Sequence, residues 1–145
     1  MLRSGVDIIE VERIDRAILR HGQRFFDRFY TTRELVDSGA HTPALAARFA
    51  AKEAVAKVLG TGIGDVTWKE IEVVNGPRRE PLLRLHGQAR ELAQALGLSN
   101  WAISLSHTHE HAVAVAVALQ LYDETVRDEL DAADSTSISI PADPS

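Results

Sequence analysis

The residues best suited to chemistry in this chain are an acid and a base one helical turn apart. Glu53 and Lys57 lie in the segment 48–60, which is rich in alanine, lacks proline and ends at a glycine, as a helix would. At about 100° per residue the two side chains share one face. The simplest interpretation is an i,i+4 salt bridge on a surface helix. The segment is too apolar to be a simple surface helix. We therefore favour a helix that packs on its neighbours and presents the carboxylate and the ammonium at a functional site.

A second acid, Asp7, interrupts an apolar segment that is predicted to be a strand over residues 2–11. It lies between Val6 and Ile8, and Gly5 allows another backbone to come close. A carboxylate buried without a partner is costly, so Asp7 needs either a cation or water. Both a functional acid and a solvent-facing acid on an edge strand fit this pattern.

The central helix carries a second pair of charges, Arg48 and Lys52, on nearly the opposite face. A glycine-rich stretch, GTGIG over residues 60–64, follows the helix and includes Gly60 and Gly62. It cannot be a P-loop, because it follows a helix and lacks the Gly-Lys-Ser/Thr ending. It is either a flexible connection or a backbone contact to a ligand.

Three histidines alternate in the stretch 106–111, SHTHEH: His107, His109 and His111. Alternation within a strand would place them on one face, as a zinc site needs. The stretch is predicted to be a hairpin turn, which breaks the alternation, and no fourth ligand is evident. A hydrogen bond from His107 to a phosphate is the favoured role.

Composition limits the class of protein. The 145 residues suit one domain, 45% of them are hydrophobic, and there is no cysteine for a disulfide or a thiolate zinc site. No apolar run approaches the length of about 20 residues that spans a membrane. Asp7 and Glu10 interrupt any signal-peptide pattern, so a cytoplasmic location is expected. The net charge of −5 disfavours a general nucleic-acid binder.

The charge is unevenly distributed, because ten of the sixteen bases fall within residues 1–60 while the segment 123–145 is acidic. Within the predicted helical segment 10–30, bases recur at helical spacing at Arg13, Arg16, Arg20, Arg24 and Arg28. Such a strip is either a solvated face or a docking surface for an acidic helix of another protein. The acidic segment could compete for that surface.

Hydrophobic periodicity predicts the remaining elements. Gly22 could divide the helical segment 10–30 in two, and a capped short helix is expected at 31–36. Further along the chain, strands are predicted at 66–74, 83–86, 101–106 and 112–121, and a helix at 88–96.

Taken in order, four motifs resemble the holo-acyl-carrier-protein synthases, the short class of 4′-phosphopantetheinyl transferases. They are GVDIIEVER at 5–13, RFAAKEAVAK at 48–57, GTG at 60–62 and SLSHT at 104–108. The resemblance covers residues 4 to about 121. It departs at the long turn from Asn75 to Pro81, at His109 and His111, and in the acidic tail.

The resemblance implies transfer of phosphopantetheine from coenzyme A to a serine of apo acyl carrier protein, with release of adenosine 3′,5′-bisphosphate. By similarity, Asp7 and Glu53 bind Mg²⁺, as two carboxylates with substrate oxygens would. Lys57 then holds the pyrophosphate as a point charge. The proton acceptor is either Glu53 or a metal-bound water. The implied coenzyme A contacts, besides Lys57, are Arg48, Gly60, Gly62 and His107.

The family also implies an α+β fold with an antiparallel sheet wrapping a central helix, and a homotrimer that binds coenzyme A between subunits. The carrier would dock on Arg13, Arg16, Arg20 and Arg24. The expected division is a transferase domain over 1–122 and an acidic extension over 123–145. Two alternatives remain: the same chemistry on a polyketide or peptide synthase carrier, and a non-catalytic binding module.

Overall fold

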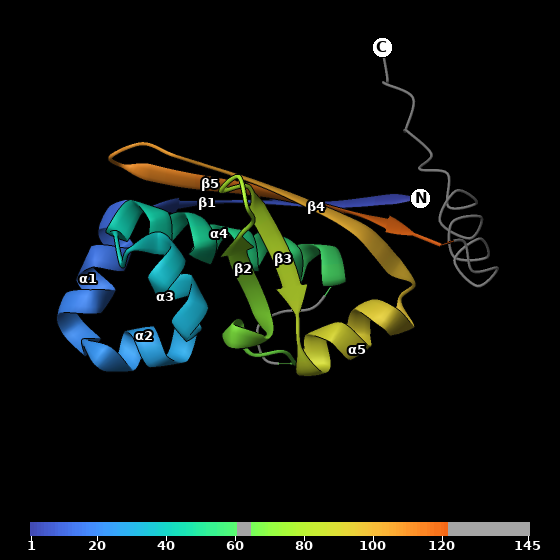
Figure 1. The fold of residues 1–145 in the computed structure, drawn as a ribbon, viewed down its shortest axis with the longest axis horizontal. Helices are drawn as coiled ribbons and strands as arrows, with labels where there is room; N and C mark the ends of the chain where they lie inside the picture. The colour runs from blue at the N-terminus through green and yellow to red at the C-terminus, as the bar shows by residue number, and fades with distance from the viewer. Residues whose placement is uncertain (61–64, 122–145) are drawn as a thin grey trace, which may run out of the picture.

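The structure is a computed structural model that describes residues 1–60 and 65–121. Within these residues it has an α+β fold of two antiparallel sheets and surrounding helices (Figure 1). In chain order the elements are β1 (Leu2–Glu10), α1 (Val11–His21), α2 (Gln23–Phe29), α3 (Thr32–Ser38), α4 (Thr42–Leu59), the 3-10 helix η1 (Trp68–Glu70), β2 (Ile71–Asn75), β3 (Pro81–Leu85), α5 (Gly87–Ala95), β4 (Leu98–His107) and β5 (His111–Gln120).

The larger sheet has the strand order β1-β5-β4 and lies along α4. Its central strand presents alanine to the helix at every second position, because alternate residues of a strand face the same side. These small side chains face an alanine-rich helix, so the helix and the sheet can pack closely. The alanines of β5 in this core are Ala112, Ala114, Ala116 and Ala118.

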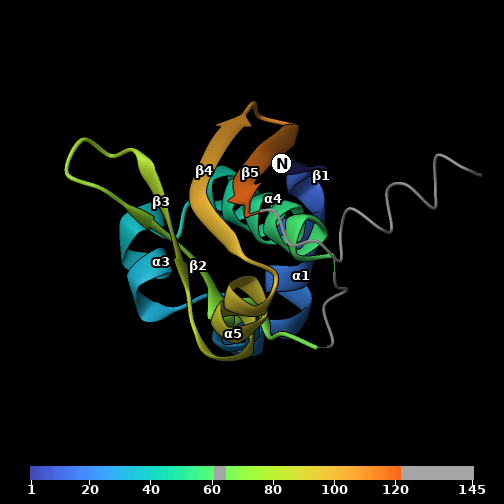
Figure 2. The same cartoon turned by 90° about the vertical axis from the view of Figure 1, so that its right-hand side faces the viewer.

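Helix α4 is surrounded by other elements, as Figure 2 shows in the view along the molecule. Pro43 stands in its first turn, and Gly60 ends it with a left-handed backbone at φ 73°. The end at Gly60 matches the sequence prediction, and the helix begins six residues before the segment 48–60 in which it was recognised. Since α4 is apolar on most sides and buried, it organises the core, and its few charged residues must each find a partner.

The segment 10–30 forms two helices, as the sequence suggested, because Gly22 takes a positive φ of 57° between α1 and α2. One detail differs from the predicted elements. The strand predicted at 66–74 starts only at Ile71. A capping box between Thr67 and Glu70 turns the preceding residues into η1 instead.

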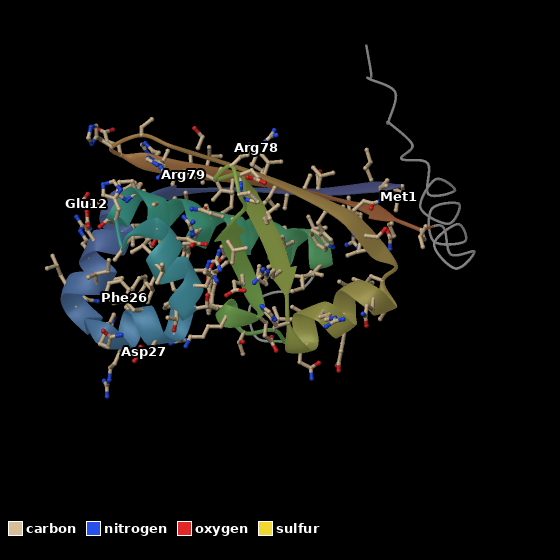
Figure 3. The ribbon with its side chains drawn as sticks, in the orientation of Figure 1. Met1, Glu12, Phe26, Asp27, Arg78 and Arg79 are labelled. Atoms are coloured by element: carbon tan, nitrogen blue, oxygen red, sulfur yellow. The ribbon has the colours of Figure 1, made fainter. Side chains whose placement is uncertain are left out.

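The smaller sheet is the β2–β3 hairpin, which packs beside β4. Its turn carries Arg78 and Arg79 (Figure 3), with Arg79 in a left-handed conformation. Across residues 1–60 and 65–121, every helix is too short or too polar to cross a bilayer. Gly62 and the acidic segment 123–145 lie outside the described residues, so the boundary at residue 122 stays a prediction.

Candidate active site

Three of the predicted site residues, Asp7, Glu53 and Lys57, come together where β1 packs against α4. The approach is close because Gly5 has no side chain: a Cβ there would collide with the carbonyl oxygen of Ala54. The Lys57 ammonium donates to the Val6 carbonyl at 2.7 Å and to Asp7 Oδ1 at 3.2 Å. Lys57 therefore pairs with an acid of the neighbouring strand. The simpler interpretation, an i,i+4 salt bridge between Lys57 and Glu53, does not form among the described residues.

The two acids of this site influence each other electrostatically. Burial raises the pKa of the Glu53 carboxyl above its ordinary value, the negative charge of Asp7 raises it further, and Lys57 lowers it. A carboxyl shifted upward by a neighbouring acid gains from a cation placed between them. Asp7 and Glu53 thus form a pair of negative groups that one ammonium only partly compensates.

The donor set fits a hard divalent cation. Carboxylate oxygens are ligands that Mg²⁺ prefers, and this ion usually keeps several waters or takes phosphate oxygens. Over the ranges that the structure describes, no three acids or histidines are arranged as a metal site. Asp7 and Glu53 would therefore supply only part of the coordination, and water and substrate oxygens would supply the rest.

Arg48 lies apart from the acids, on the face of α4 that packs against β2. Its side chain is 6% exposed and donates to the carbonyls of Val73 (3.3 Å) and Ala44 (3.4 Å) and to Asn75 Oδ1 (2.9 Å). Burial lowers the pKa of Arg48, and nearby Glu34 and Asp37 oppose that shift. A coenzyme A contact by Arg48 stays a prediction, and in this chain Arg48 ties α4 to the β2–β3 hairpin.

The other charged residue of that face, Lys52, forms a buried network that the sequence did not reveal. Its ammonium donates to Glu34 Oε1 (2.7 Å) and to the carbonyls of Ile71 (2.6 Å) and Trp68 (3.0 Å). Glu34 also accepts from the backbone N–H of Thr31 and Val73. The capping pattern at residues 31–34 predicted a helix start. It gave no sign that Glu34 would be fully buried against a lysine.

His107 lies at the end of β4, on the face of the sheet that points toward α4. The register pairs it with Ala112, which in turn pairs with Ile9, two residues from Asp7 along β1. It is exposed and therefore free to meet a ligand. Gly60 ends α4 near Arg3, whose guanidinium would lie 3.0 Å from an added Cβ.

Comparison with known proteins identifies the family. A family model described as the 4′-phosphopantetheinyl transferase superfamily matches residues 3–116. The chain belongs to this superfamily. The holo-[acyl-carrier-protein] synthase of Herpetosiphon aurantiacus is 48% identical over 114 residues, which cover 74% of this chain and 90% of that protein. Its counterpart from Halorhodospira halophila is 51% identical over 106 residues, covering 70% and 84%.

Solved structures agree with this family. The crystal structure of the Helicobacter pylori synthase in complex with coenzyme A has a TM-score of 0.74 at 30% identity, covering 80% of this chain and 99% of that one. The Bacillus anthracis synthase, in complex with CoA (3′,5′-ADP), has a TM-score of 0.66 at 34% identity, covering 82% and 96%. The family, the α+β fold class and the assignment as a transferase enzyme, all predicted from the sequence, are confirmed.

The transferase also exposes its predicted arginine strip on α1 and α2. Arg16 donates to Glu12 at 2.8 Å on the outer surface of α1 (Figure 3). An open cleft of about 470 Å³ runs between the two helices, with Arg13 and Arg24 at its rim and Phe25 and other aromatic rings in its wall. The strip thus combines positive charge with accessible apolar surface.

Proposed function

We propose that the chain transfers the 4′-phosphopantetheine group from coenzyme A to a serine of apo acyl carrier protein, with Mg²⁺ held by Asp7 and Glu53. The observation that carries this is the meeting of the two acids and Lys57 at the β1–α4 contact, in a chain of this family. The coenzyme A complexes of similar synthases support the donor substrate.

In this reaction the serine oxygen forms a bond to the phosphorus that carries pantetheine, and the bond from that phosphorus to the bridging oxygen breaks. Adenosine 3′,5′-bisphosphate leaves with the bridging oxygen. Lys57 holds the pyrophosphate as a positive point charge, where negative charge increases during bond cleavage. A bound magnesium ion would supply the rest of that neutralisation. The serine proton passes to a base at the same place, either Glu53 or a water molecule.

The acidic carrier docks on the arginine strip in this proposal. Arg13, Arg16, Arg20 and Arg24 are all exposed, and Leu19 among them is 86% exposed. Exposed bases attract a negatively charged helix over a distance and set its orientation. An exposed leucine offers apolar contact once the two surfaces meet.

We further infer a homotrimer, supported by the outer face of the larger sheet. Apolar side chains gather there and point away from α4, and exposed apolar patches of this kind commonly form protein interfaces. They are Leu2, Val6, Ile8, Val115 and Leu119. Light scattering on the full chain and on Ile8→Glu tests this, since a monomeric wild-type chain would contradict it. The cytoplasmic location stays a prediction of the sequence.

The test of the proposed function is incubation with coenzyme A, Mg²⁺ and apo carrier, followed by mass spectrometry of the carrier. Asp7→Asn and Glu53→Gln should each lower the transfer rate by about a thousandfold, the scale of losing a preorganised charge at a transition state. The matched control is Glu91→Gln, an exposed acid on α5. Full activity in both variants, or activity unaffected by a chelator, would contradict the proposal. Apo carriers from fatty-acid, polyketide and peptide synthases define the carrier class.

A further inference from the structure

Lys57 is already engaged by the acid that the proposed function assigns to the metal. An ammonium has three N–H donors. One of them reaches the Val6 carbonyl at 2.7 Å and a second reaches Asp7 Oδ1 at 3.2 Å. In this structure Lys57 is therefore the counterion of Asp7.

The geometry allows the ammonium to leave Asp7 without moving the backbone. The root of the lysine is fixed because Gly5 packs against α4, with the Lys57 Cβ only 3.1 Å from the position of an added Cβ. The rest of the side chain is 54% exposed, whereas that of Asp7 is 22% exposed. A long side chain with a fixed root and an exposed end can turn between two acceptors on the same side of the helix.

A divalent cation and this ammonium compete for the same carboxylate. Both are positive, and their mutual repulsion within a partly buried site is larger than it would be in bulk water. The competition ends if the ammonium finds another anion nearby. In the proposed reaction the pyrophosphate of coenzyme A is that anion.

We propose that Lys57 is an exchangeable counterion: it neutralises Asp7 in the empty site and moves to the pyrophosphate when the metal takes its place on Asp7. This inference depends on the proposed function, since it needs Asp7 as a metal ligand. The Val6 carbonyl can keep its hydrogen bond during the exchange, because only the donor to Asp7 has to turn. The exchange makes the metal and coenzyme A bind cooperatively. The metal releases the ammonium for the pyrophosphate, and the pyrophosphate draws the ammonium away from the carboxylate that the metal needs.

This coupling is reciprocal by thermodynamic necessity. Lys57 lowers the affinity of the site for a metal alone, and this penalty becomes smaller once coenzyme A is bound and the ammonium has moved to the pyrophosphate. The empty enzyme is therefore protected from trapping a divalent ion without substrate. A lysine that served only to attract phosphate, and did not pair with Asp7, would leave the affinity for the metal alone nearly unchanged, because salt screens the repulsion between separated exposed charges.

The experiment is a titration of the full chain with Mn²⁺ in the absence of coenzyme A, with free Mn²⁺ read by electron paramagnetic resonance. Lys57→Met should bind Mn²⁺ at least about fivefold more tightly than the wild type, the lower end for coupled sites. The matched control is Lys69→Met, which removes the same charge from an exposed lysine of η1. Lys57→Gln, which keeps a polar end, should behave like Lys57→Met.

Coenzyme A binding, measured by calorimetry with and without Mn²⁺, completes the test. Mn²⁺ should improve coenzyme A affinity by a smaller factor in Lys57→Met than in the wild type. If Asp7→Asn loses Mn²⁺ binding but Lys57→Met binds it no more tightly than Lys69→Met, the counterion role is overturned and the metal assignment stands. If Asp7→Asn binds Mn²⁺ like the wild type, the metal assignment fails and the counterion role fails with it.

Discussion

Two lysines of α4, five residues apart, illustrate two uses of the same side chain. Lys52 is fully buried and all three of its donors reach protein acceptors, Glu34 and two backbone carbonyls. Lys57 is about half exposed, has two acceptors, and lies beside an acid pair that it only partly neutralises. Both lysines carry the same charge. A lysine whose three N–H donors all have protein acceptors has a structural role, whereas one with a donor to spare can bind a ligand.

The surroundings explain the difference. Burial lowers the pKa of Lys52, and the charge of Glu34 opposes that shift. The pair lies between α3, α4 and β2, where water cannot replace either partner. Lys57 lies at the edge of the β1–α4 contact, where solvent and a ligand can reach it. Substitutions at both lysine sites and at the surfaces around them should therefore differ in what they change, stability or ligand binding.

The largest effect is expected for Lys52→Met, which leaves the buried Glu34 carboxylate without its cation. We expect the free energy of unfolding to fall by about 3–5 kcal/mol, the cost of breaking a buried pair by removing one partner. Urea denaturation followed by circular dichroism measures it. The double variant Lys52→Met/Glu34→Gln should recover part of the loss, and a single variant as stable as the wild type would refute the structural role.

Gly5→Ala tests the contact that brings the functional lysine and the acids together. The new methyl group would collide with the Ala54 carbonyl, so β1 and α4 must move apart. We expect a loss of about 1–3 kcal/mol in the free energy of unfolding, as overpacked sites show. Thermal unfolding gives the stability, and Mn²⁺ titration should show weakened binding. Gly39→Ala is the contrasting variant: its added Cβ meets nothing within 4 Å but its φ is positive, so it should cost stability without weakening Mn²⁺ binding.

A smaller effect concerns the pH dependence of stability at Glu53. Its pKa is raised in the folded protein above the ordinary value of 4.5, so the folded state holds this proton more tightly than the unfolded state does. The resulting stabilisation is complete below pH 4.5 and is lost as the pH rises through the folded-state pKa.

Glu53→Gln removes this dependence. With chelator present, its stability relative to the wild type should increase as the pH rises above 4.5 and level off above the folded-state pKa. Urea denaturation of both proteins between pH 4 and 8 measures the difference, with Glu91→Gln as the control. A difference that is constant across this range, or that decreases with pH, would be inconsistent with the raised pKa.

The smallest effect on stability is expected for Arg16→Ala on α1. Arg16 and Glu12 form an exposed i,i+4 pair, with side chains 73% and 66% exposed. Such pairs contribute about 0.3–0.5 kcal/mol, so unfolding should hardly change. The Michaelis constant for the carrier should nevertheless exceed the wild-type value severalfold at low salt. The difference should shrink at high salt, because screening weakens the attraction that Arg16 supplies in the wild type. An unchanged constant would remove Arg16 from the docking surface.

Much of the fold could be predicted because its signals are local. The glycines at 22 and 60, the proline in the first turn of α4 and the alternating alanines of β5 each act within a few residues. The strand predicted at 66–74 begins only at Ile71, and a local signal is again the reason. A capping box between Thr67 and Glu70 was not recognised, and its local hydrogen bonds favoured a 3-10 turn over extended chain.

The residues of the candidate site could be predicted from the sequence, but the contacts between them could not. Asp7, Glu53 and Lys57 were all identified, and the structure places them together. Helical spacing alone suggested that Lys57 would pair with Glu53. Its actual partner, Asp7, is fifty residues away in the sequence, and only the packing of β1 against α4 brings the two within reach.

The family, the central helix and the residues of its two charged faces could all be predicted from the order of amino acids. The tertiary structure decided which face became the core: Arg48 and Lys52 were covered by α3 and β2, while Glu53 and Lys57 stayed at an open edge. Helical periodicity cannot make that choice, because it fixes the angle between side chains and not which neighbour will cover them. Burial depends on distant segments, and burial sets the partners and the pKa values of these groups.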